Sequence, residues 1–215
     1  MNKKIIAVLS SAIMALSFSS LKAQDINFGF SLMAGQSDVS GSEKENGSAS
    51  DKNSASREES FYGGSLFVEF VADNGYAIGL DYIPLDIEIG SGKRTDTSTG
   101  ADAASEADTG TRSASASLED LMTLYANVPF GNDYYGLVGY HMVTVTTDES
   151  LPSSSYGSDD ITGYQVGLGK RGDGFKIEVF YSDFDDISLT ATGGKGSHKI
   201  DADADAMGVK LSFHY

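Results

Sequence analysis

The chain has 215 residues, no cysteine and a formal net charge of −16 at pH 7. This length suits one domain, and the absence of cysteine excludes disulfide staples, thiolate nucleophiles and thiolate zinc ligands. The acidic balance excludes binding to nucleic-acid phosphates, because that interaction needs a basic surface. The sequence also offers no motif for a cofactor or a resident metal, so we expect neither.

The first residues resemble a secretory signal peptide. Lys3 and Lys4 precede an apolar run over residues 5–18, which a small-residue stretch follows. The run is shorter than the roughly 20 residues that a membrane-spanning helix needs, which disfavours an anchor helix. We therefore predict a signal peptide over residues 1–23, cleaved after Ala23, and a mature domain over residues 24–215.

Period-two alternation of apolar and polar residues predicts eight strands in the mature domain. They are expected at residues 26–35, 60–71, 76–85, 118–128, 134–145, 161–170, 175–184 and 203–215. Each is close to the 9–11 residues that a tilted strand needs to cross a bilayer. Many glycines also disfavour helix, where each costs about 1 kcal/mol relative to alanine.

The predicted connections alternate between short and long. Short turns rich in Gly, Asn and Asp are expected at residues 72–75, 130–133 and 171–174, and long loops at residues 36–59, 86–117, 146–160 and 185–202. The stretch from Thr95 to Ser117 is so simple in composition that we expect a mobile, solvated loop. Outer-membrane barrels show this rhythm of short periplasmic turns and long extracellular loops. The pattern predicts an all-β, eight-stranded antiparallel up-and-down transmembrane barrel.

Each predicted strand has an apolar face and a face of charged and small residues. A membrane barrel directs the apolar face to lipid and the polar face to its interior. The inward face then carries a lumen charge network of Glu69, Asp81, Lys176, Glu178 and Lys210, with bulky Phe67, Tyr125 and Phe180 beside it. Lys210 and Glu178 should pair across adjacent strands. A packed structural network is one interpretation, and a conducting or gating lumen is the other.

The last strand alternates apolar residues and ends in an aromatic residue. Its pattern of Val209, Leu211, Phe213 and Tyr215 is similar to the signal by which the barrel-assembly machinery recognises its clients. The chain as a whole resembles the small outer-membrane barrels that include OmpX, OmpW, the opacity-type proteins and the OmpA-like transmembrane barrel. The resemblance implies outer-membrane residence, with lipid and lipopolysaccharide as partners. Its members have several activities, so it does not select one.

Two functions remain open. The first is a structural or surface-interaction role, as a monomer with long acidic extracellular loops. The second is a narrow porin-like channel or a conduit for small hydrophobic solutes. The acidic stretch from Asp201 to Asp205 is expected to be a solvated rim, with a weak cation or lipopolysaccharide-bridging site as the alternative.

We predict no enzyme. His198 falls in a long loop, and Ser212 and His214 share an inward face without an evident orienting acid. His141 is expected inside the barrel, with no partner that the sequence identifies. No catalytic residue is therefore assigned from the sequence.

Overall fold

The computed structural model describes residues 23–44, 52–96, 110–150, 155–191 and 199–215. The predicted signal peptide lies outside these residues except for Ala23, which begins the first strand. Among the described residues, no helix is long and apolar enough to cross a membrane.

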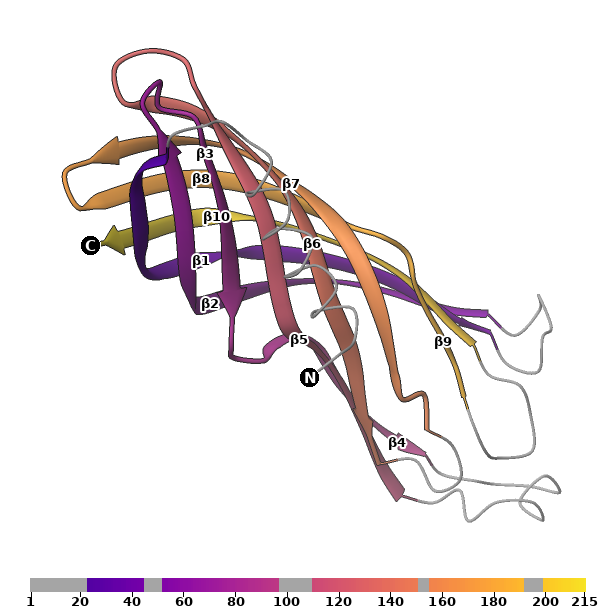
Figure 1. Cartoon of the computed structure of the whole chain (residues 1–215). Coiled ribbons are helices and arrows are strands. Elements are labelled where there is room, and N and C mark those ends of the chain that lie inside the picture. The colour runs from indigo at the N-terminus through magenta and orange to yellow at the C-terminus, as the bar shows by residue number, and fades with distance from the viewer. Residues whose placement is uncertain (1–22, 45–51, 97–109, 151–154, 192–198) are drawn as a thin grey trace, which may run out of the picture.

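The described chain forms antiparallel strands that follow one another around a single sheet (Figure 1). The first five are β1 (Ala23–Lys44), β2 (Lys52–Ala72), β3 (Ala77–Ile83), β4 (Ile87–Asp96) and β5 (Gly110–Pro129). The others are β6 (Tyr134–Glu149), β7 (Ser158–Gly172), β8 (Phe175–Phe184), β9 (Ile187–Thr190) and β10 (Lys199–His214). Because β4 continues the line of β3, and β9 continues the line of β8, the strands occupy eight positions around the wall. We call each of these positions a stave.

The sheet closes on itself through β1 and β10. Their antiparallel pairing runs from Gly29 opposite His214 to Lys44 opposite Lys199. Neighbouring staves pair in sequence order around the rest of the wall. The fold is therefore the predicted closed eight-stranded antiparallel barrel.

The three predicted tight turns are confirmed at one end of the barrel, where the C-terminus also lies (Figure 1). In the first turn, the Gly75 amide donates to the Ala72 carbonyl over 2.8 Å, and Gly75 has a φ of 82°. In the last, Gly174 has a φ of 74°. Glycine adopts these positive φ values without the steric strain that a side chain would add.

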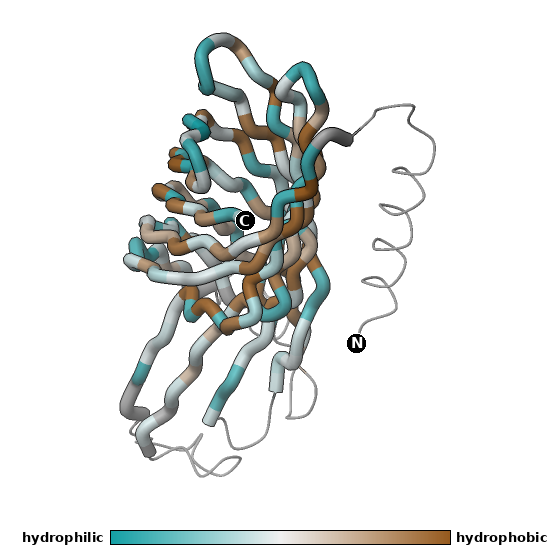
Figure 2. Tube along the Cα trace, turned by 60° about the vertical axis from the view of Figure 1, so that its left-hand side comes forward, coloured by the Kyte–Doolittle hydropathy of each residue, from teal (hydrophilic) through white to brown (hydrophobic). Residues whose placement is uncertain are grey.

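Apolar residues recur along the strands of the barrel (Figure 2), and the exposed ones form an apolar belt on its exterior. Large apolar side chains that are at least half exposed include Ile26, Phe28, Leu32, Leu66, Val138, Val166, Leu168 and Val179. Exposed aromatic residues stand at both edges, with Tyr62 at one edge and Tyr134 and Tyr215 at the other. The predicted orientation of the strands is confirmed, since Asp81, His141 and Lys176 are buried inside. Such a belt suits contact with acyl chains rather than water.

The strands are longer than predicted at the end opposite the tight turns. Residues 36–44 and 52–59 were expected to be loop, but they extend the β1–β2 ladder to Lys44 opposite Lys52. Residues 87–96 and 110–117 of the expected loop over residues 86–117 likewise belong to β4 and β5, paired as far as Asp96 opposite Gly110. The loop prediction was wrong for these flanks; the central parts of the long loops lie outside the described residues.

A buried apolar cluster explains why the strands continue. Its members are Ile83, Ile89, Leu118, Leu121, Val143, Val145, Tyr156, Ile161, Ile187, Leu189 and Ala204. They come from β3 to β7, β9 and β10 and from the segment before β7, and they cover the inner face of the extensions. Burying apolar area stabilises by about 25 cal/mol per Å², which offsets the entropy lost when these low-complexity segments become ordered.

The exposed belt yields a stability prediction. Val179 is 52% exposed and lies beside outward-facing Leu168 and Val209. Val179→Arg should lower the free energy of unfolding by about 2–4 kcal/mol, because arginine near mid-membrane must be removed from water. Leu85→Arg, in the exposed connection between β3 and β4, should cost about 0–1 kcal/mol. Urea titration in lipid vesicles measures both, and equal losses would contradict the lipid-facing assignment.

Candidate functional site: the barrel interior

The five charges of the predicted lumen network all lie inside the barrel. Glu69, Glu178, Lys176, Asp81 and Lys210 are each at most 7% exposed. They come from β2, β3, β8 and β10, where the strand period places them on the inward face. Buried charges are tolerated only where partners compensate for lost hydration, so their contacts decide what the interior can do.

Glu69 is the centre of the group nearer the tight turns. Its carboxylate lies 2.9 Å from Lys176 Nζ and 2.8 Å from Arg171 Nη2. Asn127 Nδ2 donates to it over 2.9 Å and the Tyr125 hydroxyl over 3.2 Å. Four donors from three other strands therefore converge on one carboxylate.

Lys210 is the centre of the second group. Its Nζ lies 3.2 Å from Glu178 Oε2, the pair expected from the sequence, and 3.4 Å from Asp81 Oδ2. The Tyr135 hydroxyl donates to Glu178 Oε1 over 2.7 Å, and Ser65 Oγ donates to Asp81 over 3.1 Å. One ammonium thus forms ion pairs with two carboxylates from different strands.

Aromatic rings fill the space around the charges. Lys176 Nζ lies 4.5 Å from the centre of the Phe67 ring and 5.3 Å from that of Tyr125. The Tyr125 ring lies so closely over Gly79, its partner on the adjacent strand β3, that a Cβ there would clash with the ring. Together the rings and ion pairs form a plug across the barrel at the level of the belt.

Sequence reasoning missed Arg171, because this residue was assigned only to a tight turn. The structure places its guanidinium against Glu69. With Arg171 the interior groups contain three carboxylates and three cations, so the buried charges balance. A basic residue adjoining a tight turn, within reach of inward acids, was the signal that could have identified it.

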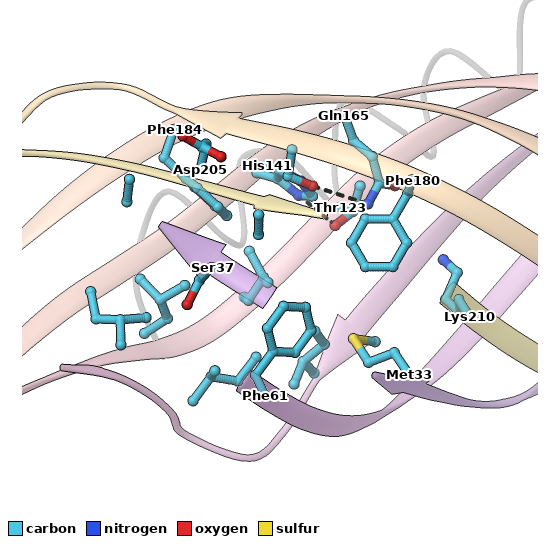
Figure 3. Close-up of a pocket in the computed structure, with 18 of the residues that line it drawn as sticks. Met33, Ser37, Phe61, Thr123, His141, Gln165, Phe180, Phe184, Asp205 and Lys210 are labelled. Carbon is cyan, nitrogen blue, oxygen red and sulfur yellow. Dashed lines mark hydrogen bonds between the residues drawn. The ribbon is translucent and has the colours of Figure 1, made fainter. Parts of the chain in front are cut away.

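A small cavity lies on the outer side of the plug (Figure 3). It has a volume of about 60 Å³ and mostly apolar walls, to which Met33, Phe61 and Phe180 contribute. Asp81 and Lys210 from the plug lie at its inner end. The buried apolar cluster of the strand extensions continues its wall through Ile83 and Ile89.

A hydrogen-bonded histidine forms one side of this cavity. His141 Nδ1 lies 2.8 Å from Thr123 Oγ1, and His141 Nε2 lies 3.0 Å from Ser182 Oγ. Gln165 Nε2 donates to the same serine oxygen over 3.3 Å. The sequence predicted that His141 points inward but identified none of these partners.

The other residues considered from the sequence are not brought into such a group. Ser31 Oγ donates to Ser212 Oγ over 2.9 Å, in a pair remote from His141. His198 lies outside the described residues. Among the residues that the structure describes, no three His, Cys, Asp or Glu side chains gather in a way that could hold a metal ion.

No protein-family model and no curated protein matches the chain. Among solved structures, the chain is similar to Ail of Yersinia pestis at 15% identity and TM-score 0.42, covering 89% of this chain and 100% of Ail. It is similar to OprG of Pseudomonas aeruginosa at 16% identity and TM-score 0.48, covering 87% of this chain and 95% of OprG. It is also similar to the outer-membrane protease OmpT of Escherichia coli at 10% identity and TM-score 0.50, covering 92% of this chain and 99% of OmpT. At this identity the likeness to OmpT shows the fold alone, which is that of an outer-membrane barrel.

The two charge groups predict unequal consequences of losing one lysine. Lys210→Met leaves Asp81 and Glu178 buried with no cation, and breaking a buried pair in this way costs about 3–5 kcal/mol. Lys176→Met should cost less, because Glu69 retains Arg171 and Asn127. Urea titration in vesicles tests the order, and a larger loss for Lys176→Met would refute it.

Proposed function

We propose that the protein is a closed, non-conducting outer-membrane barrel that presents extended, acidic outer strands for surface interaction. The observation that carries this proposal is the plug, in which balanced ion pairs and aromatic rings occupy the interior at the level of the apolar belt. An eight-stranded barrel is only wide enough for side chains to fill it. An ion crossing it would have to separate buried pairs.

The outer surface near the belt supports an interaction role. Asp38, Asp205 and Asp183 occupy one register row across β1, β10 and β8. A hydrogen bond with Asp186 raises the pKa of Asp203, one step further out on β10. Like charges directly opposite one another destabilise a sheet, so this acidic surface is not explained by the stability of the barrel alone.

The proposed partners follow from the exterior. Lipid and lipopolysaccharide would surround the apolar belt, and the barrel-assembly machinery would read the last strand. The side chains of Val209 and Tyr215 are 46% and 78% exposed, on the outward face that also holds Leu211 and Phe213. One closed barrel satisfies the strand pairing, which favours a monomer.

Planar-bilayer recording tests the closed-barrel proposal. The refolded mature chain should give no unitary currents, because the ion pairs around Glu69 and Lys210 occlude the axis. A variant that removes bulk from the plug, Tyr125→Ala with Phe67→Ala, should admit small currents if it still migrates as a folded barrel on unheated gels. Regular unitary currents from the unaltered protein would overturn the proposal.

Binding or uptake of small hydrophobic solutes is a second candidate, favoured by the apolar cavity and a seam in the wall. The β2–β3 ladder ends at Leu66 opposite Tyr82. Within the described ladders, β2 beyond this point pairs only with β1, and β4 pairs only with β5. Cavity-lining Ile83, Ile87 and Ile89 lie on the β3–β4 side of this seam.

Titration with xenon, an apolar probe small enough for the cavity, followed by xenon NMR of the refolded protein, tests the second candidate. Ile83→Phe fills the cavity and should weaken probe binding at least tenfold. Ile78→Phe, on the outward face of the same strand, should leave it unchanged. Equal binding by both variants and the unaltered protein would remove the cavity from consideration as the binding site.

A further inference from the structure

We propose that Ser182 and His141 form a hydrolytic centre that cleaves short-chain carboxylic esters in the cavity outside the plug. This activity goes beyond the proposed surface role and does not depend on it. The proposal rests on the direct pairing of a serine hydroxyl with a histidine nitrogen in a cavity with apolar walls. A serine becomes a useful nucleophile when an adjacent base can take its proton.

The geometry provides a nucleophile, a base and a group that orients the base. Ser182 Oγ lies 3.0 Å from His141 Nε2, within the reach required for proton transfer. Thr123 Oγ1 lies 2.8 Å from Nδ1 on the other side of the ring. If Nδ1–H donates to Thr123, Nε2 is the acceptor for the serine proton. Phe184 stacks on the imidazole with ring centres 5.1 Å apart and fixes its plane.

The surroundings match an ester with a short apolar acyl chain. Ser182, His141 and Thr123 all line the cavity, where Phe180 lies beside this polar group and Phe61 lies on the opposite side (Figure 3). The volume of about 60 Å³ admits only a short chain. Gln165 Nε2 donates to Ser182 Oγ over 3.3 Å, and we assign this amide as the side-chain donor that turns to the oxyanion of the tetrahedral intermediate.

The reaction balances with water as the co-reactant. Ser182 Oγ attacks the ester carbonyl carbon while its proton passes to His141 Nε2. The intermediate collapses, the bond between carbon and alcohol oxygen breaks, and His141 returns the proton to the departing alcohol. Water then repeats the sequence on the acyl-serine, which releases a carboxylic acid and restores Ser182. Thr123 acts as a positioning residue throughout.

Labelling with a short n-alkyl fluorophosphonate tests the nucleophile in the refolded mature chain. Mass spectrometry should find one adduct per barrel, mapped to Ser182 in the unaltered protein. Ser182→Ala should abolish labelling, and His141→Gln should slow it at least ~100-fold, the effect of losing a general base. Ser212→Ala is the matched control, because Ser212 is also buried but bonds to Ser31 rather than to histidine.

Turnover and the positioning role need their own measurements. The barrel should release more than one equivalent of nitrophenol from p-nitrophenyl butyrate. Thr123→Val should lower kcat at least tenfold, and Thr123→Ser should restore it. Unheated gel migration confirms that each variant is folded. The proposal is overturned by no adduct, an adduct elsewhere, undiminished labelling of His141→Gln, or release limited to one equivalent; none of these outcomes bears on the closed-barrel proposal.

Discussion

The structure depends on closing the backbone hydrogen bonds of a sheet that faces lipid. Acyl chains offer no partner for a backbone amide or carbonyl, so every stave at the level of the belt must be paired on both sides. The β1–β10 ladder provides this closure. Once the sheet is closed, strand alternation sends every second side chain into an enclosed interior. The charges on that face must then find one another inside the barrel.

Inside the barrel, the buried charges are compensated by opposite charges and hydrogen bonds rather than by water. Glu69 is fully buried, yet it contacts Lys176 and Arg171 and accepts hydrogen bonds from Asn127 and Tyr125. Removing one member would leave an uncompensated charge, which costs more than the pair contributes when intact. Such a network therefore resists opening. This resistance is the physical reason for preferring a closed barrel to a channel.

The sequence predicted those features that follow from the alternation of apolar and polar residues along a strand and from the residue types of tight turns. Alternation assigned the lipid-facing side of β8, and adjacency in the strand order placed Lys210 beside Glu178. The sequence could not predict contacts between strands that are not adjacent, because the approach of His141 on β6 to Ser182 on β8 depends on the tilt and stagger of the strands. The outer parts of β2 and β5 were also missed. These parts are rich in serine, alanine and glycine and show little hydrophobic alternation. They are ordered by pairing with the neighbouring strands and by the buried apolar cluster on their inner face.

The plug and the apolar cluster divide the interior into two regions with different chemistry. Lys210 and Asp81 belong to the plug and also form the inner end of the cavity, so their ion pair lies between the cavity and the tight-turn end. In the closed barrel that we propose, a molecule would enter and leave the cavity from the outer mouth or through the seam between β2 and β4. Such a site suits binding or local chemistry better than transport. Ser182 and His141 lie on the wall of this space, where a ligand would remain beside them.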